Sequence, residues 1–231
     1  MSEGRTALVT GATSGHGRAV AHELARRGHT VIVHGRDAGR VEAVRAELRE
    51  AGGAEPPPGR VADLASLEEV HRLADEVAAT DRLDVLVNNA GVFAAGGKRE
   101  VSTDGHELTL AVNHLAHFAL TLRLLDLLRA SAPARIVNVS SAGQAPIDPD
   151  DLMLERGWEP WRAYMQSKLA QVMFTRSLAE RLDPGEVTAT ALHPATFMDT
   201  PMVRSFTEPA STAEEGADAT VRLAVDPGLG A

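Results

Sequence analysis

The chain has 231 residues, of which 44% are hydrophobic and 24% are charged, and it carries a formal net charge of −9 without a single cysteine. This length suits one domain with a sizeable core, the lack of cysteine excludes disulfides and thiolate metal sites, and the negative charge disfavours a nucleic-acid partner. No apolar run approaches the ~20 residues that cross a bilayer, and the first residues leave no room for a signal peptide, so we expect a cytoplasmic protein with no membrane span.

Short apolar runs alternate with longer stretches of helical periodicity along the whole chain. The runs are apolar almost throughout, which is typical of strands buried on both faces. They predict six strands, at residues 6–11, 30–35, 59–64, 83–91, 134–141 and 186–194. The stretches between them predict helices at 15–28, 37–51, 66–79, 104–130, 161–183 and 213–225. This alternation predicts an α/β fold, in one domain over residues 1–231, with a parallel sheet between two layers of helices.

The first predicted strand ends in a glycine-rich turn, TGATSGHG, at residues 10–17. Gly11 can make the tight turn, Gly15 lets backbone N–H groups approach a pyrophosphate, and Gly17 lets the next helix pack closely on the strand. The N-terminus of that helix would present unpaired N–H groups and the positive end of its dipole to the phosphate. A plain tight turn is the alternative, but the strand–turn–helix context favours a dinucleotide site.

The stretch YMQSK contains Tyr164, the only tyrosine of the chain, and Lys168 four residues later. On a helix these two side chains share one face. A free tyrosine has a pKa of about 10, too high for an efficient base at neutral pH, and a neighbouring ammonium group lowers that pKa. Such a pair also arises by chance, so its meaning depends on the other motifs.

Three further features complete a pattern: NNAG at residues 88–91, Asn113 within LAVNHLAHF, and the serine pair at 140–141. Together with the glycine-rich turn and YMQSK, in this order, they resemble the short-chain dehydrogenase/reductase family over about residues 5–202. The resemblance is to the single-domain branch, and most of all to its retinol-dehydrogenase-like members. It implies a Rossmann-type doubly wound parallel sheet of six or seven strands, in the order 3-2-1-4-5-6(-7), with helices on both faces.

The resemblance also implies roles for individual residues. Tyr164 would be the general acid/base, and Lys168 would assist it and bind the nicotinamide ribose. Ser141 would orient the substrate oxygen, with Ser140 as the second candidate, and Asn113 would hold a water that links the lysine to solvent. Structural roles stay open for three of the implied cofactor residues, Asp63, Asn89 and Gly91. The full implied cofactor-binding set is Gly11, Thr13, Ser14, Gly15, His16, Gly17, Arg36, Asp63, Leu64, Asn89, Ala90, Gly91, Tyr164, Lys168, Pro194 and Thr196.

The end of the second predicted strand, VIVHGRD, predicts a preference for NADP(H) over NAD(H). NAD-preferring relatives carry an acid at the position of Gly35, which holds both adenine-ribose hydroxyls. Glycine instead leaves space for the 2′-phosphate of NADP. Arg36 can bind that phosphate with two parallel charged hydrogen bonds, and His34 and Arg40 can assist. We expect Asp37 to cap the following helix.

The chain departs from the family pattern at several places. His16 stands where an aliphatic residue is usual, and we expect it to affect packing rather than catalysis. Residues 144–161 should form an insertion near the substrate pocket, alongside a substrate loop at 195–212. We expect the insertion to be mobile without ligand and to close over substrate, with Trp158 and Trp161 either packing the loop or contacting substrate. His114 and His117 form the nearest histidine pair, but they lack an evident third ligand, so we expect no metal site.

The leading hypothesis is an NADP-dependent oxidoreductase that transfers a hydride between nicotinamide and a small carbonyl or alcohol substrate, as a carbonyl reductase or alcohol dehydrogenase does. One alternative is a regulator that senses NAD(P) without turnover, and another is a sugar-nucleotide epimerase or dehydratase. The presence of all four catalytic residue types disfavours the regulator, and the chain length disfavours the epimerase. The substrate cannot be read from the sequence, and self-association into a homo-oligomer stays open.

Overall fold

A computed structural model describes residues 4–52 and 58–229 of the chain. Its six strands form one parallel sheet in the order β3-β2-β1-β4-β5-β6, which confirms the predicted topology. No seventh strand occurs within the described ranges. The strands are β1 (Thr6–Val9), β2 (Thr30–Gly35), β3 (Arg60–Val61), β4 (Val85–Asn88), β5 (Ala134–Val139) and β6 (Val187–Leu192).

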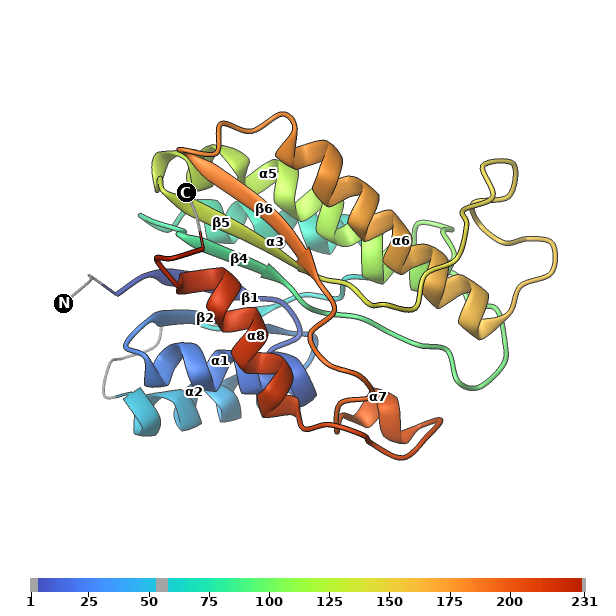
Figure 1. Ribbon diagram of the computed structural model, residues 1–231, viewed down its shortest axis with the longest axis horizontal. Helices are drawn as coiled ribbons and strands as arrows, with labels where there is room; N and C mark the ends of the chain where they lie inside the picture. Colours follow the sequence, from blue (N-terminus) through green and yellow to red (C-terminus); the bar gives the residue numbers. More distant parts are fainter. Residues whose placement is uncertain (1–3, 53–57, 230–231) are drawn as a thin grey trace.

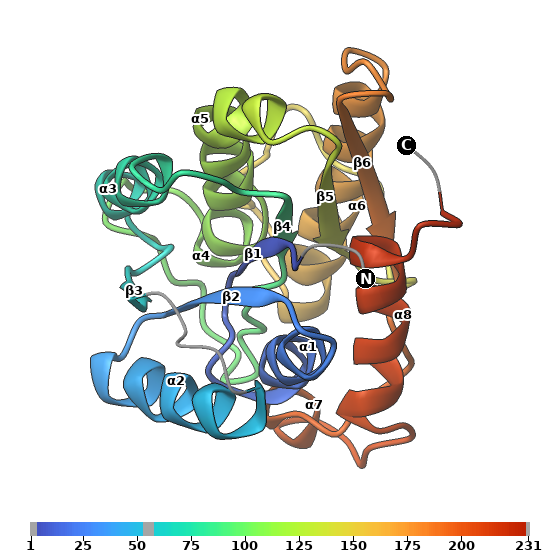
Figure 2. The ribbon, with the colours of Figure 1, turned by 90° about the vertical axis from the view of Figure 1, so that its left-hand side faces the viewer.

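Helices cover both faces of this sheet, so the doubly wound prediction is confirmed (Figures 1 and 2). One face is covered by α1 (Gly15–Arg26), α2 (Ala38–Gly52) and α8 (Ala213–Val225). The other face is covered by α3 (Leu67–Ala78), α5 (Ala116–Ala130) and α6 (Pro160–Ala179). Two short elements, α4 (Leu108–Leu110) and the π-helical turn η1 (Ala111–Leu115), lead into α5, and α7 (Pro201–Arg204) lies within the 195–212 loop.

Several predicted strands are longer than the observed ones, and β4 shows why. This strand was expected over 83–91 but ends at Asn88. The backbone N–H groups of Asn89 and Ala90 donate to Oγ1 of Thr10, at 2.9 and 3.0 Å, and not to a neighbouring strand. The Thr10 hydroxyl therefore accepts the hydrogen bonds that strand pairing would otherwise take. The sheet ends here, and residues 89–91 can line a site.

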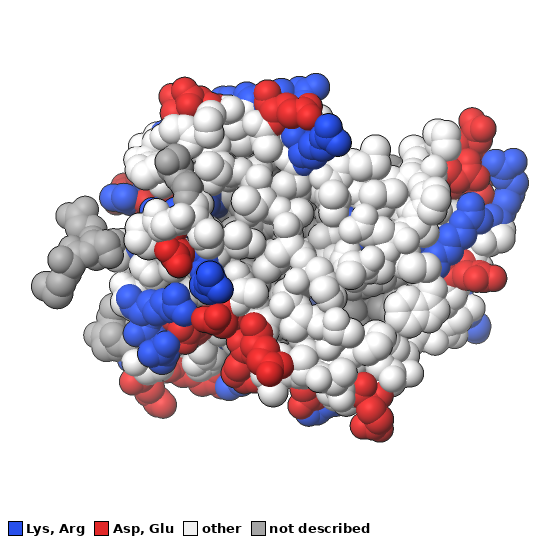
Figure 3. All heavy atoms as spheres, in the orientation of Figure 1, with Lys and Arg blue, Asp and Glu red and all other residues white. Residues whose placement is uncertain are grey.

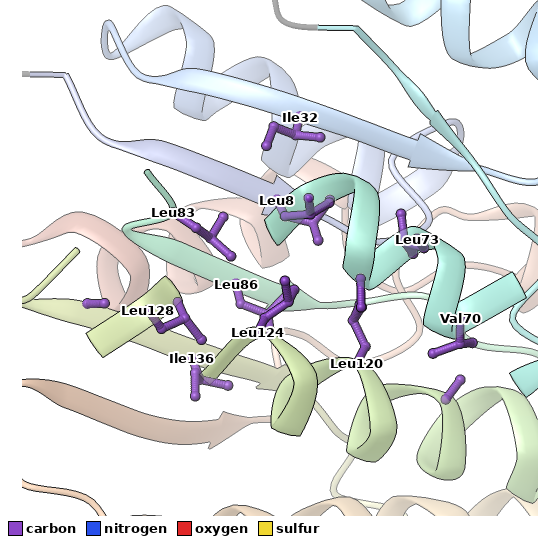
Figure 4. Close-up of a cluster of buried hydrophobic side chains, with 14 of the residues drawn as sticks. Leu8, Ile32, Val70, Leu73, Leu83, Leu86, Leu120, Leu124, Leu128 and Ile136 are labelled. Atoms are coloured by element: carbon purple, nitrogen blue, oxygen red, sulfur yellow. The ribbon is translucent and has the colours of Figure 1, made fainter. Parts of the chain in front are cut away.

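The core lies on both faces of the sheet, and Figure 4 shows the part between the sheet, α3 and α5. Every side chain labelled there is at most 1% exposed. Complete burial of a leucine side chain contributes about 1.5–3 kcal/mol, so this cluster fixes α5 firmly against the strands. The labelled residues are Leu8, Ile32, Val70, Leu73, Leu83, Leu86, Leu120, Leu124, Leu128 and Ile136.

The stretch Leu108–Ala130 differs from its prediction as one regular helix. It contains the π-helical turn η1, in which hydrogen bonds skip one extra residue. The stretch is 23 residues long and contains an 18-residue window with a mean hydropathy of 1.3, so in the described part of the chain it is the one helix that could cross a membrane by length and composition. The expectation that no apolar run approaches this length is therefore wrong. Half of that window is buried, and Leu120, Leu124 and Leu128 face the core, as in a core helix of a folded domain.

The loops that follow β4, β5 and β6 all leave the sheet at its carboxyl edge, on the right of Figure 1, whereas both chain ends lie on the left. In open α/β sheets this edge is where ligands bind. The surface in Figure 3 is uncharged over its centre, with charged side chains gathered near its margins. The fold thus directs the search for a site to the carboxyl ends of the strands.

Candidate active site

A cavity of about 890 Å³ lies at the carboxyl edge of the sheet. Its walls include every residue that the sequence analysis assigned to the cofactor, together with Ser141, Tyr164 and Lys168. Asn113 is the exception among the assigned residues, because it does not line the cavity and is fully buried behind it. The structure therefore brings together segments that lie more than a hundred residues apart in the sequence.

The backbone of the glycine-rich turn packs so closely that Gly11 and Gly17 leave no room for a side chain. Gly11 has a φ of +66°, and a Cβ atom there would lie 2.9 Å from the Cα of Ala90. A Cβ atom on Gly17 would lie 2.3 Å from both the carbonyl oxygen of Gly11 and Nδ2 of Asn89. Ser14, the N-cap of α1, makes no side-chain capping bond. The first N–H groups of α1 therefore lack a side-chain acceptor, as a phosphate site requires.

The side chains of Asn89 and His16 hold this turn in place through hydrogen bonds. Nδ2 of Asn89 donates to the carbonyl oxygen of Thr10 at 2.8 Å, while its Oδ1 lies 2.8 Å from Nδ1 of His16. The other ring nitrogen of His16 lies 3.1 Å from Oγ1 of Thr220 on α8. Burial lowers the pKa of His16, so the ring is neutral at physiological pH. The histidine thus connects α8 to the floor of the site, in line with the packing role expected for it.

Arg36 and Asp63 lie at one end of the cavity, where the sequence analysis placed the adenosine half of the cofactor. Arg36 is exposed and makes no hydrogen bond or ion pair with any other described residue, so it is available to a ligand. Asp63 is also exposed, and its Oδ1 accepts from the backbone N–H of Ala65 at 2.9 Å. It does not cap α3, because Ser66 does so by accepting from the N–H of Glu69.

The surroundings of Gly35 differ in two ways from the expectation. A Cβ atom on Gly35 would lie 2.5 Å from Cγ2 of Thr13, so the threonine methyl group fills the position where an acid would stand. His34 cannot assist a phosphate, because its ring is 2% exposed and faces inward. Its Nδ1 accepts from the N–H of Gly11 at 3.2 Å, and its Nε2 lies 3.1 Å from the carbonyl oxygen of Ala62. Asp37 caps α2 as expected, by accepting from the N–H of Arg40 at 2.8 Å.

Tyr164 projects from the first half of α6 toward the loop after β5. The Ser141 side chain acts on its hydroxyl group and lowers the pKa of Tyr164, and both residues line the cavity. Oγ of Ser141 in turn accepts from the N–H of Gly143 at 3.1 Å, which fixes its direction. Ser140 is buried instead, and its hydroxyl donates to the backbone carbonyl of Lys168 at 2.8 Å. This geometry favours Ser141 over Ser140 as the partner of the tyrosine.

Lys168 lies one turn further along α6 and is only 4% exposed. Its Nζ donates to the carbonyl oxygen of Val139 at 2.8 Å and to Oε1 of Gln171 at 2.9 Å, and it lies 5.6 Å from the ring centroid of Tyr164. Burial lowers the pKa of Lys168 to about 7. Burial also raises the pKa of Tyr164, against a smaller lowering by Ser141. The pKa of Tyr164 is therefore raised and not lowered, and Lys168 is not among the causes of its shift, so the expected lowering by the ammonium group is wrong.

Asn113 lies in η1, where the irregular turn aims its side chain at the loop after β4. Its Oδ1 accepts from the N–H of Val92 at 2.8 Å, and its Nδ2 donates to the carbonyl oxygen of Val92 at 3.1 Å and to Oγ of Ser167 at 3.0 Å. The side chain therefore clamps the NNAG loop to α6. It acts on the site by positioning the loop and not by lining the cavity.

The sequence analysis did not foresee an aromatic wall on the substrate side of the cavity. Phe93 lies at its centre, with ring centroids 4.6 Å from Trp161, 5.0 Å from Phe206 and 5.8 Å from Tyr164. Phe197 extends this wall at 6.1 Å from Phe206. These rings come from two different loops and from α6, so no local sequence pattern could have grouped them. They make the space beside the tyrosine hydroxyl apolar.

The insertion is attached to the body of the domain. Nε1 of Trp158 donates to Oε1 of Glu107 at 3.1 Å, and Leu154 is 2% exposed. The guanidinium group of Arg99 donates to the carbonyl oxygen of Met153 at 2.9 and 3.1 Å. Of the two tryptophans, Trp158 packs the loop, whereas Trp161 lines the cavity. These contacts favour a packed insertion over a free lid.

The histidine pair has no metal-site geometry. Within residues 4–52 and 58–229, no group of three or more His, Cys, Asp or Glu side chains could hold an ion. His117 is fully buried, with Nδ1 at 3.2 Å from the carbonyl oxygen of Asn113 and Nε2 at 3.1 Å from Oγ1 of Thr10. Burial lowers its pKa to about 3, so it serves as a neutral link between η1 and β1.

Comparison with known proteins connects this site to a family. The family model for short chain dehydrogenase matches residues 5–211. Retinol dehydrogenase 14 of Homo sapiens is 44% identical over 210 residues, which cover 84% of this chain and 62% of the relative. Retinol dehydrogenase 13 of Homo sapiens is 44% identical over 195 residues, which cover 83% of this chain and 58% of the relative. The chain therefore spans less than two thirds of the length of these curated relatives.

Solved structures agree with this relationship. A short-chain dehydrogenase from Sphingobium yanoikuyae in complex with NADPH has a TM-score of 0.76 at 26% identity, covering 94% of this chain and 83% of that chain. A complex of Pseudomonas aeruginosa RhlG with NADP has a TM-score of 0.77 at 29% identity, covering 97% of this chain and 91% of that chain. Taken with the family match over residues 5–211, these likenesses show that the chain belongs to the short-chain dehydrogenase family.

Proposed function

We propose that this protein is an NADP-dependent oxidoreductase that transfers a hydride between nicotinamide and a carbonyl or alcohol substrate. The observation that carries the proposal is that Tyr164, Ser141 and the buried Lys168 line one cavity together with Arg36. Such a cavity can hold an extended dinucleotide with its reactive end beside a proton donor.

The residues present fit a nicotinamide cofactor. The glycine-rich turn and the uncapped start of α1 would hold the pyrophosphate, and Lys168 would bind the nicotinamide ribose with its remaining N–H group. Leu64, Ala90, Pro194 and Thr196 line the same cavity and would contact the cofactor along its length. When bound, the cofactor supplies or accepts the hydride.

Proton transfer falls to Tyr164. Because burial raises its pKa, the side chain is a neutral phenol at pH 7 and can donate a proton to a carbonyl oxygen. Ser141 can hold the same oxygen with a second hydrogen bond, and Asn113 keeps the neighbouring loop in place. The protonated phenol suits carbonyl reduction at neutral pH, and alcohol oxidation should become faster as the pH rises.

The preference for NADP is supported by Arg36, an exposed guanidinium group on the cavity wall without a partner in the described parts of the chain. Arg40 lines the same region. A guanidinium group can bind a phosphate with two parallel hydrogen bonds. Thr13 fills the place of the acid that would select NAD, so no carboxylate stands there to repel the 2′-phosphate.

The substrate we propose is a carbonyl compound with a bulky apolar substituent. Phe93, Trp161 and Phe206 surround the approach to Tyr164, and none of these side chains carries a charge. An apolar substituent gains about 25 cal/mol for each Å² that leaves water, whereas a charged substrate would lose solvation there. Several relatives are named retinol dehydrogenases, which makes retinol a natural first probe.

The decisive test is NADPH consumption with a panel of aldehydes and ketones, and NADP⁺ reduction with retinol and simple alcohols. The control is Tyr164→Phe, which keeps the ring contacts and removes only the hydroxyl. We expect its turnover to fall by about 10²- to 10⁴-fold, while its NADPH affinity stays unchanged. Turnover by the phenylalanine variant at the wild-type rate would contradict the assignment. NADPH binding without turnover of any probe would favour the sensing regulator.

A further inference from the structure

We propose that Gln171 is a positioning residue for Lys168, and that its carboxamide oxygen sets both the direction and the charge of the catalytic ammonium group. The inference rests on the proposed function for its catalytic consequence, but the contact itself is independent of it. Oε1 of Gln171 accepts a hydrogen bond from Nζ of Lys168 at 2.9 Å. Gln171 follows Lys168 by three residues on α6, so the helix brings the two side chains onto one face.

The contact is enclosed by the protein. Gln171 is 2% exposed, so its amide has no access to bulk water. An ammonium group has three N–H donors and no acceptor, so the atom that faces it must be the carbonyl oxygen of the amide. The amide nitrogen then points the other way, where it lies 3.5 Å from Nδ1 of His117. The orientation of the side chain is therefore determined by its neighbours.

The donors of Lys168 can be counted. One N–H goes to the carbonyl oxygen of Val139 at 2.8 Å and a second goes to Gln171. The third is left for a ligand. Nζ itself lies beside the NNAG loop, where a Cβ atom on Gly91 would be 3.8 Å from it. If the Gln171 acceptor were removed, the ammonium group could rotate, and no group would fix which N–H points into the cavity.

The electrostatic surroundings make this acceptor important. Within the described ranges, Lys168 forms no salt bridge with a carboxylate, and Gln171 is the only side chain that accepts from its Nζ. Three titratable groups face it: Tyr164 on its own helix, His117 on α5 and His16 on α1. Burial lowers the pKa of both histidines and raises that of Tyr164, so all three are neutral at pH 7. The amide dipole is therefore the main side-chain partner for the positive charge.

The chain offers a direct readout, because it contains only two lysines, Lys98 and Lys168. In protein labelled with ¹³C at the lysine ε carbon, each lysine gives one NMR signal, and Lys98 is an exposed internal reference. The signal of Lys168 reports its titration midpoint in the protein without cofactor. This measurement needs no substrate and no turnover.

Two substitutions at position 171 should move this midpoint in opposite directions. Gln171→Glu puts a carboxylate beside the ammonium group and should raise the midpoint by about 1 to 3 pH units. Gln171→Met has a similar length but no strong acceptor, and it should lower the midpoint. A matched control is Gln166→Met, which changes a second buried glutamine of α6 that makes no contact with Lys168 and should leave the signal in place.

The pH profile of kcat with NADPH should shift in the same direction as the NMR midpoint in each variant. A residue that only packs the helix would lower stability without moving the two midpoints in opposite directions. If Gln171→Met does not fold, Gln171→Asn, which withdraws the amide by one methylene group, should replace it and also lower the midpoint. Unchanged midpoints in both the glutamate variant and the shortened or apolar variant would overturn the inference. Shifted midpoints in a protein that turns over no substrate would leave the inference intact and count against the proposed function.

Discussion

Replacing Arg36 by alanine should remove most of the discrimination between NADPH and NADH. The guanidinium group is exposed on the cavity wall and free of partners among the described residues, so its loss breaks no contact inside the protein. A hydrogen bond to a charged group contributes about 1.5–3 kcal/mol. At about 1.4 kcal/mol per decade, NADPH should be preferred by roughly 10- to 150-fold in the wild type, and Arg36→Ala should lose most of that preference.

The reverse experiment must take account of Thr13. An aspartate at position 35 would put its Cβ atom 2.5 Å from Cγ2 of this threonine, so Gly35→Asp alone should cost about 1–3 kcal/mol of stability through overpacking. Thr13→Ala removes the obstructing methyl group. The double variant should therefore recover stability and turn the preference toward NADH, which makes the two substitutions strongly non-additive.

The assay is the ratio of kcat/KM for NADPH to that for NADH, and equilibrium binding of each cofactor provides the same ratio without a substrate. Thermal unfolding of the wild type, Thr13→Ala, Gly35→Asp and the double variant measures the coupling free energy between positions 13 and 35. Arg129→Ala, an exposed arginine on α5 outside the cavity, is the control for the loss of a positive charge. A wild type that prefers NADH, or an Arg36→Ala variant with an unchanged ratio, would refute the reasoning.

Three further outcomes are expected. Ser141→Ala should reduce kcat more than Ser140→Ala in steady-state assays. Ser140→Ala should instead lower the free energy of unfolding by about 1 kcal/mol, because the hydroxyl of Ser140 donates to the backbone of α6. The opposite ranking of kcat would move the catalytic role to Ser140. Trp158→Phe, which loses the bond to Glu107, should accelerate amide exchange in the insertion, and unchanged exchange would mean that other contacts hold it. Burial lowers the pKa of Lys168 from 10.5 to about 7, so the unfolded chain binds more protons between these values and stability should rise with pH across this window. In the wild type, Lys168 should make the free energy of unfolding, measured by urea titration, rise by at most about 1.4 kcal/mol per pH unit in this window, and Lys168→Met should remove this contribution. If the free energy of unfolding depends on pH equally in the two proteins, the lysine is not buried as a neutral amine.

Local patterns indicated the glycine-rich turn and the Tyr164–Lys168 pair, and the alternation of strands and helices predicts the sheet edge at which they meet. The assignment of Asn113 came from the resemblance to the family and not from spacing. The strand ends were predicted less well, because the pattern of apolar residues continues past Asn88 while the backbone N–H groups leave the sheet for Thr10. A side-chain acceptor in the turn after β1 leaves no trace in the local sequence around β4.

Contacts between distant segments account for what the sequence did not predict. Phe93, Trp161 and Phe206 meet only because two loops converge on α6, and Thr13 fills the space beside Gly35 only because the first turn crosses the end of β2. Gln171 could have been noticed, since it follows Lys168 by three residues on the same helix face. The role of Gln171 becomes visible only in the structure, where both side chains are buried and Oε1 of Gln171 lies 2.9 Å from Nζ of Lys168.

The π-helical turn at 111–115 has a consequence for any change in the length of this helix. An α-helix advances about 100° per residue, and a π turn accommodates one extra residue, so the faces before and after η1 are out of phase with an uninterrupted helix. Leu108 lies on the cavity wall before the turn, and Leu120 and Leu124 lie in the core after it. Deleting one residue within 111–115 would therefore let the stretch close into a regular α-helix with both faces still in place, but it would remove the turn that aims Asn113 at the NNAG loop. The irregular turn thus holds one residue more than a regular helix needs between the cavity wall and the core, and its loss should affect the site and spare the fold.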